Sequence, residues 1–273
     1  MNKEQIKIEL KNLTKAEEKF ISKNIAVKES KLQEKIEKYV PETLEKTLNT
    51  AFYKAFGIIF EKGTSFIEKT YNKEKHEQDF KVNEYSADLR NNKGSLKKFG
   101  RVALLNKTLN TTISAVEGVG MGMFGMGIPD IPVFLSVILK SIYETALHFG
   151  FGYETEEERM FILKIIETSL CHEDDLIHGD MEINSWISSD GKELFSKSID
   201  EQIKKTSLVL SEELLYLKFI QGIPVAGVIG GVSDVVYQKK ITDYALLKYK
   251  RRFLIKHLDE DVIICGEKPH SLL

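Results

Sequence analysis

Asp130, Glu144 and His148 are the residues whose types and surroundings best fit acid–base chemistry. Glu144 and His148 are four residues apart, so a helix would place them on one face. Asp130 lies between two prolines in an apolar stretch, where a carboxylate needs a hydrogen-bond donor or stays protonated. The three are therefore candidate catalytic residues of an enzyme of unknown reaction. The alternative for Asp130 is structural, because it could cap a helix that begins near Pro132.

A second polar group, between positions 172 and 180, has the side chains of a cation site. His172, Asp175 and His178 are its candidate metal ligands. Their spacing fits neither an EF-hand nor an H-E-x-x-H helix, so we predict no metal and favour a solvated acidic loop. The two cysteines, Cys171 and Cys265, are too few for a thiolate zinc site or a disulfide scaffold, and they fit a reducing compartment.

Two glycine-rich apolar stretches, residues 118–127 and 222–231, are the most unusual feature of the chain. The first contains a literal G-x-G-x-x-G, but no strand precedes it, so we predict no nucleotide and no other cofactor. Glycines four residues apart let helices approach closely, in a membrane or in a protein core. The glycines that we expect at a membrane or partner contact are Gly118, Gly120, Gly122, Gly125, Gly127, Gly227, Gly230 and Gly231.

The last predicted helix, residues 233–257, carries the one clear basic patch. Its candidate contacts to a membrane or partner are Lys248, Lys250, Arg251 and Arg252. A basic amphipathic helix is typical of proteins that dock to anionic lipid or to another protein. The alternative is pairing within the chain, with the acidic stretch 154–182. We expect no nucleic-acid partner, since no binding motif accompanies the patch.

The overall composition excludes several classes of protein. The chain has 273 residues, 39 Lys and Arg against 41 Asp and Glu, and 42% hydrophobic residues, as in a folded domain with a sizeable core. A net charge of −2 gives no global attraction to nucleic acid or acidic lipid. The longest uncharged run, residues 219–233, is shorter than the roughly 20 residues of a membrane-spanning helix. We expect no signal peptide at the N-terminus.

Helical periodicity dominates the chain, and alternating strand patterns are absent. We predict helices after Pro41 over residues 42–71, over 134–149, after the capping box Thr155-x-x-Glu158, and over 196–220. A further capping box, Thr14-x-x-Glu17, predicts a helix start near residue 14. Residues 72–100 are polar and predict a flexible loop, and residues 171–195 lack periodicity. The fold class is therefore an all-α multi-helix bundle with two glycine-rich apolar helical segments.

Several long strings of residues resemble the EcsC family. They begin at Gly127-Ile-Pro-Asp-Ile-Pro-Val-Phe-Leu, at Glu156-Glu-Glu-Arg-Met-Phe-Ile-Leu-Lys and at Lys218-Phe-Ile-Gln-Gly-Ile-Pro-Val. The resemblance covers roughly residues 40–258. It implies a bacterial protein whose founding relative is encoded beside the subunits of an ABC transporter, and it carries no catalytic residues. We divide the chain into a polar helical extension (1–40), an EcsC-like all-α domain (41–258) and a tail (259–273).

These observations favour a non-enzymatic protein at the cytoplasmic face of the membrane. The glycine-rich stretches would insert or dock, and the basic helix would meet anionic headgroups or a transporter subunit. Two other readings stay open: a soluble interaction scaffold whose glycine-rich stretches form its own core, and an enzyme that uses Asp130, Glu144 and His148 near one pocket.

Overall fold

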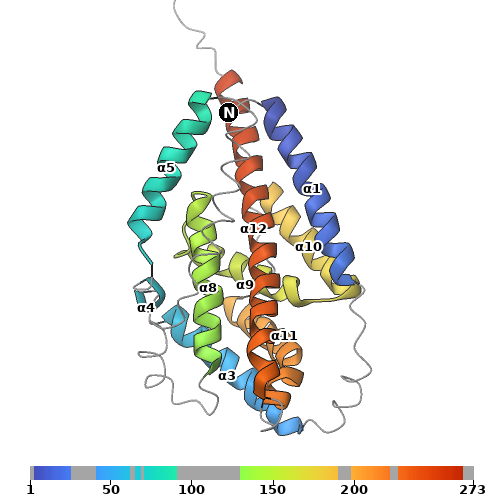
Figure 1. Ribbon diagram of the computed structural model, residues 1–273. Helices are drawn as coiled ribbons and strands as arrows, with labels where there is room; N and C mark the ends of the chain where they lie inside the picture. Colours follow the sequence, from blue (N-terminus) through green and yellow to red (C-terminus); the bar gives the residue numbers. More distant parts are fainter. Residues whose placement is uncertain are drawn as a thin grey trace, which may run out of the picture.

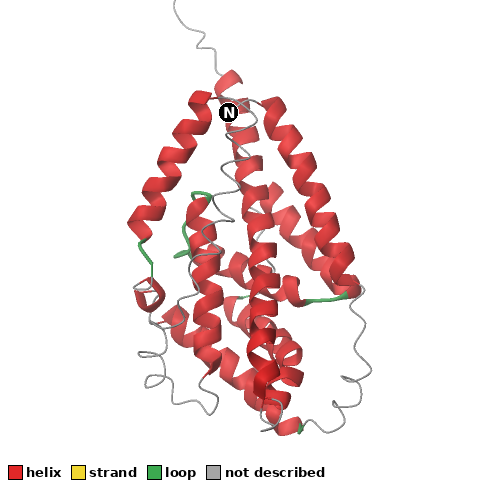
Figure 2. Ribbon diagram, viewed as in Figure 1, coloured by secondary structure: helices red, strands yellow, loops and turns green. Residues whose placement is uncertain are grey.

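The computed structural model describes residues 3–25, 41–61, 65–68, 71–90, 130–189, 198–221 and 227–266. Within these ranges every regular element is an α-helix, which confirms the predicted all-α bundle (Figures 1 and 2). The helices are α1 (Lys3–Ile25), α3 (Glu42–Glu61), α4 (Ser65–Glu68), α5 (Lys73–Arg90), α8 (Asp130–His148), α9 (Glu156–Leu170), α10 (Glu173–Ser188), α11 (Ile199–Gln221) and α12 (Gly227–Gly266).

Helix α9 forms the centre of the bundle. Every residue from Met160 to Leu170 is buried, so this helix needs neighbours on all sides. Helices α10, α11 and α12 supply them by packing against it. Its start follows from the sequence, since the Thr155 side chain accepts a hydrogen bond from the Glu158 backbone N–H at 3.2 Å. The helix start predicted at Thr155 is therefore confirmed, but the Glu158 carboxylate accepts hydrogen bonds from Tyr249 and Arg252 of α12 instead of closing a capping box.

Helix α12 is the long axis of the molecule. Its 40 residues span about 60 Å at about 1.5 Å per residue. It contacts α1, α8, α9, α10 and α11, and Figure 1 shows α1 and α5 on opposite sides of its upper half. The helix continues to Gly266, so it includes part of the predicted tail.

A glycine turn ends α8 and redirects the chain toward α9. Gly150 has φ +78°, in the left-handed region that side chains disfavour. A Cβ atom at Gly150 would lie 2.4 Å from the Phe80 ring of α5. This turn therefore depends on glycine both for its backbone conformation and for the close approach of α5.

Helix α5 occupies part of the predicted flexible loop, residues 72–100. Its sequence is polar with little apolar periodicity, which is why the pattern favoured a loop. Tertiary contacts compensate: Phe80 packs edge-on against Phe253 of α12, and Glu84 accepts a hydrogen bond from His257 Nε2 at 3.1 Å. Residues 91–100 lie outside the described residues.

Residues 171–195 predict a long loop or short irregular helices, and α10 corrects this by forming one regular helix over Glu173–Ser188, while residues 190–195 lie outside the described residues. The buried face of α10 includes Gly179 and Asp180, and these two residues interrupt the apolar pattern. Gly179 lies so close to Thr168 of α9 that a Cβ atom would come within 2.5 Å of the threonine hydroxyl. Asp180 is buried because it pairs with a cation of α12. The hydropathy pattern is irregular because Gly179 makes a close helix–helix contact and Asp180 forms a buried ion pair.

Two further helix boundaries differ from the predictions. Residue Thr14 lies inside α1, where its hydroxyl donates to the Leu10 carbonyl at 3.0 Å, so the capping box predicted there is wrong. The helix predicted over residues 42–71 is described as α3 and α4, and residues 62–64 and 69–70 lie outside the description. The start after Pro41 is confirmed.

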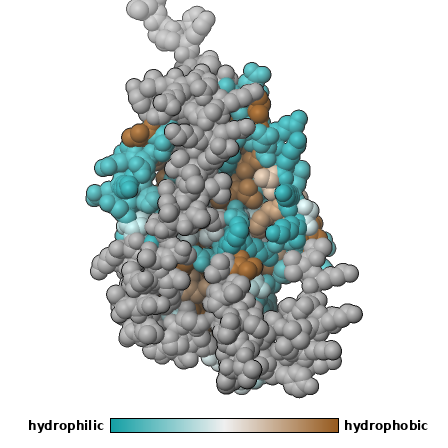
Figure 3. Space-filling model, in the orientation of Figure 1, coloured by the Kyte–Doolittle hydropathy of each residue, from teal (hydrophilic) through white to brown (hydrophobic). Residues whose placement is uncertain are grey.

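The visible described surface is mainly hydrophilic over the two outer helices. Figure 3 shows polar colours along both flanks, where α5 and α1 lie in Figure 1. Among the described residues, no helix combines the length and the apolar composition that crossing a bilayer requires.

Candidate functional site

Lys248, in the middle of α12, points into the protein. Lys248 is 0% exposed, and its ammonium group lies 2.9 Å from Glu17 Oε1, 2.7 Å from Asp180 Oδ1 and 2.9 Å from Asn184 Oδ1. The Tyr244 hydroxyl also donates to Asp180, at 2.7 Å. An ammonium group has three N–H donors, so these three acceptors match its full hydrogen-bonding capacity.

Helix α1 supplies the carboxylates for the next two cations. Arg251 donates through Nε to both oxygens of Glu17, at 2.9 and 3.0 Å, and through Nη2 to the Thr14 hydroxyl at 3.1 Å. Lys250 donates to Glu9 at 3.2 Å. Both glutamates lie on the buried face of α1, where they alternate with Ile6 and Leu13. Ion pairs therefore help to attach α1 to α12.

Arg252 lies on the opposite side, against α9 and α10. It donates to Glu158 at 2.6 Å, and the Tyr249 hydroxyl donates to the same carboxylate at 2.6 Å. Its guanidinium lies 4.1 Å from the Phe151 ring centroid and 4.7 Å from that of Trp186. Arginine suits such a place because its planar group stacks on rings while it pairs with a carboxylate.

These contacts form one charged layer across the bundle. We define the charged layer as Glu17, Glu158, Asp180, Lys248, Arg251 and Arg252. The alternative that the basic helix pairs with the acidic stretch 154–182 is what the structure shows for Lys248 and Arg252. The sequence did not indicate that the partner carboxylates are buried. A carboxylate on the buried face of a helix has the same residue type as one on the exposed face, so the hydropathy pattern does not distinguish them.

A smaller polar cluster joins α9 to α11. Glu167 lies 2.7 Å from the Lys205 ammonium and 3.2 Å from that of Lys164, and it accepts a hydrogen bond from Gln202. Burial alone would raise the pKa of Glu167, but the two lysines and the glutamine outweigh it and lower that pKa. Glu167 is thus a buried carboxylate that stays ionised and holds two helices together.

The two glycine-rich stretches join the described body at the same end. Helix α8 begins at Asp130, three residues after the end of the first stretch, and α12 begins at Gly227 within the second. Figure 1 shows both helix starts at the lower end of the molecule, and the two helices pack together. Gly227, Gly230 and Gly231 lie in the first turns of α12, while residues 118–127 lie outside the described residues.

Sequence comparison relates this chain to a known protein family. A sequence model of the EcsC protein family matches residues 4–254. The chain belongs to the EcsC protein family. The match begins at residue 4, so the EcsC region includes α1 and both of its buried glutamates, and extends further toward the N-terminus than the resemblance read from residue 40.

Two relatives from Bacillus subtilis (strain 168) show the extent of this similarity. The chain is 26% identical to the protein named Uncharacterized protein YdbA over 160 residues, which is 57% of each chain. It is also 26% identical to Protein EcsC over 125 residues, or 45% of this chain and 50% of that protein. The chain thus spans about half the length of the curated relatives it matches. No solved structure matches it.

The candidate acid–base residues of this EcsC chain do not converge. Asp130 and Glu144 are fourteen residues apart on α8, which corresponds to about 21 Å along a helix. Glu144 lies 3.8 Å from His76 of α5, and burial raises its pKa. His148 is buried at the other end of α8, beside Phe149. The side chain of Asp130 lies outside the description, and its backbone lies at the opposite end of α8 from Glu144 and His148.

The candidate metal ligands of the EcsC chain also have separate environments. His172 Nε2 lies 2.7 Å from Glu213, and Nδ1 lies 3.4 Å from the Asn24 carbonyl at the end of α1. The Glu213 hydrogen bond raises the pKa of His172. His178 is exposed and 3.5 Å from Glu182, and Asp175 is exposed. Within the described ranges, no group of residues has the arrangement of a metal site.

Proposed function

We propose that this EcsC-family chain is a non-enzymatic helical protein that docks to the cytoplasmic face of the membrane. The observation that carries this proposal is that α8 and α12 begin at one end of the bundle, each at a glycine-rich apolar stretch. Two such stretches at one end would form a single apolar docking surface for lipid or for a membrane protein. The family resemblance makes a transporter subunit the protein partner that we favour.

The charged layer supports a non-enzymatic role. Glu158, Asp180 and Lys248 are buried and ion-paired, so their hydrogen-bonding capacity is used within the fold. Contact between Lys250 or Arg251 and lipid headgroups would require α1 to leave α12, because Glu9 and Glu17 already hold these cations. We therefore assign the main docking role to the apolar end, with the basic residues of α12 as a second contact that needs rearrangement.

Liposome flotation of the whole chain tests this proposal. Vesicles of phosphatidylcholine with and without phosphatidylglycerol are compared for the wild type and for the double variant Phe124→Asp, Val225→Asp. A carboxylate in place of an apolar side chain disfavours transfer into lipid, so we expect binding to fall by at least about tenfold. The control is Val82→Asp, which changes an exposed valine of α5 that lies away from the docking end.

The outcomes separate the proposal from its alternatives. Equal flotation of the double variant and the wild type, with helical circular dichroism retained, would remove the apolar end from the mechanism. No flotation of the wild type on either vesicle would favour the interaction scaffold, in which the glycine-rich stretches pack within the protein itself.

A further inference from the structure

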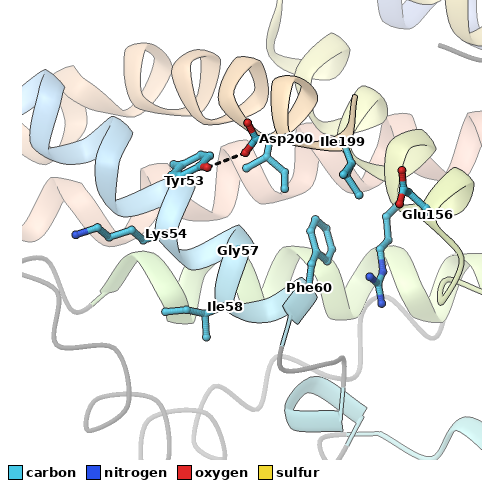
Figure 4. A pocket seen from close by; sticks show the side chains of 10 residues that line it. Tyr53, Lys54, Gly57, Ile58, Phe60, Glu156, Ile199 and Asp200 are labelled. Atoms are coloured by element: carbon cyan, nitrogen blue, oxygen red, sulfur yellow. Dashed lines mark hydrogen bonds between the residues drawn. The ribbon is translucent and has the colours of Figure 1, made fainter. Parts of the chain in front are cut away.

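A cavity of about 520 Å³ lies between α3, α9 and α11. Its volume is within the range of sites for small organic molecules. The apolar part of its lining comes from Ile58, Phe60, Ile199 and Ile203. Figure 4 shows Phe60 and Ile199 near the centre of this region, with Glu156 at one end and Lys54 at the other. The cavity therefore has an apolar middle and charged ends.

Arg159 belongs to this lining and has a side-chain nitrogen whose hydrogen-bonding capacity is unused. Its Nε is buried and has no hydrogen-bond partner, and no carboxylate pairs with it in the part of the chain that the structure describes. Its guanidinium lies 5.5 Å from the Phe60 ring centroid. A buried donor without an acceptor is unfavourable, and the guanidinium fork suits a ligand that offers two oxygens.

The two carboxylates of the lining bear on which anion fits, and both are distinct from the cation Lys54 at the other end from Glu156. Asp200 already accepts a hydrogen bond from Tyr53 at 2.7 Å and pairs with Lys204 at 2.6 Å. Glu156 adds a second carboxylate at the end of the cavity that Figure 4 shows beyond Phe60. Two carboxylates would repel a doubly charged phosphate more than a singly charged carboxylate. The apolar walls favour a ligand with a hydrocarbon body.

Gly57 shows that the cavity has room beside α3. It lies in the interior of this helix, and a Cβ atom built there would meet nothing within 4 Å. Glycine in a helix interior is unfavourable relative to alanine, and no packing contact with the described residues requires it here. A larger side chain at this position would extend from the wall that Gly57 forms.

We propose that this cavity binds an amphipathic monocarboxylate, with its carboxylate on Arg159 and its hydrocarbon chain along Phe60, Ile199 and Ile203. The Arg159 fork would supply the polar recognition, and burial of the hydrocarbon chain would supply most of the affinity. The site lies on α3, α9 and α11, so the proposal does not depend on docking at the end where α8 and α12 begin.

Isothermal titration of the whole chain with octanoate tests the site. Octanol and octyl phosphate are the matched probes, since they keep the chain length and change only the head group. We expect octanoate to bind at least about tenfold more tightly than either. Octanol equal to octanoate would overturn the role of Arg159, and tighter binding of octyl phosphate would overturn the carboxylate assignment.

Two pairs of variants locate the bound molecule. Gly57→Leu fills the cavity and should weaken octanoate binding at least about tenfold, while Gly57→Ala should leave it unchanged. Arg159→Gln should weaken octanoate but not octanol, and Arg159→Lys should have a smaller effect because it keeps the charge. If Arg159→Gln fails to fold, the comparison of Gly57→Leu with Gly57→Ala still tests whether octanoate binds in the cavity. No octanoate binding by the wild type, or wild-type binding by a folded Gly57→Leu, would overturn the proposal.

Discussion

Arg252 and Arg159 both lie beside aromatic rings, but their surroundings differ in one decisive respect. Arg252 pairs with Glu158 and stacks near Phe151 and Trp186, so its charge is balanced inside the bundle. Arg159 lies near Phe60, and its buried Nε has no acceptor among the residues that the structure describes. The comparison shows that the role of an arginine on a helix depends on whether a carboxylate of another helix pairs with it. A satisfied arginine stabilises architecture, and an unsatisfied one at a cavity indicates a place for a ligand.

The largest expected effect is the loss of Lys248 from the charged layer. Lys248→Ala leaves Glu17 and Asp180 buried without their shared cation, which should destabilise the protein by about 3–5 kcal/mol in urea denaturation. The control is Lys239→Ala, which removes an exposed pair with Asp243 and should change stability by less than about 1 kcal/mol. Equal effects of the two variants would show that the layer does not hold the fold.

The two arginines themselves provide the next comparison. Arg252→Ala removes the partner of a buried carboxylate and should destabilise the protein by at least about 2 kcal/mol. Arg159→Ala removes a guanidinium without a paired carboxylate and should change the free energy of unfolding by less than about 1 kcal/mol. Thermal and urea denaturation check both. A larger loss for Arg159→Ala would contradict the distinction between the two regions.

The His172–Glu213 pair predicts a smaller, pH-dependent effect. The Glu213 hydrogen bond raises the pKa of His172 above its ordinary value of 6.5, so the folded state holds the proton more tightly than the unfolded state. This stabilisation is fully present below 6.5 and is lost as the pH rises through the folded pKa. His172→Gln should therefore destabilise the protein more at about pH 5.5 than at about pH 8.5. A larger loss at the higher pH would contradict this assignment.

The smallest expected effect is a gain at Gly57. Gly57→Ala should stabilise the protein by about 0.5–1 kcal/mol, because alanine favours the helix and its Cβ atom has room. Gly150→Ala is the matched opposite, since its positive φ and the Phe80 ring both disfavour a side chain. A loss of stability at Gly57 would mean that the open space beside α3 is not available in solution.

Local signals predicted those parts of the fold that depend on neighbours along the chain. Pro41 and the Thr155 cap mark helix starts because each acts within one turn. Helix α10 escaped prediction because Gly179 and Asp180 are buried for reasons that lie on other helices, α9 and α12. The Arg159 cavity was also missed, since an unpaired arginine and a paired one look alike in sequence.

The sequence by itself determined the helical class, the EcsC family and the positions of the two apolar stretches, because periodicity and residue order are properties of the chain alone. Only the tertiary structure decided which charges face water. Lys248 belongs to a basic run that reads as a surface patch, yet its side chain is 0% exposed among Glu17, Asp180 and Asn184. The physical reason is that a buried ion needs partners, and these partners come from helices that are distant in the sequence.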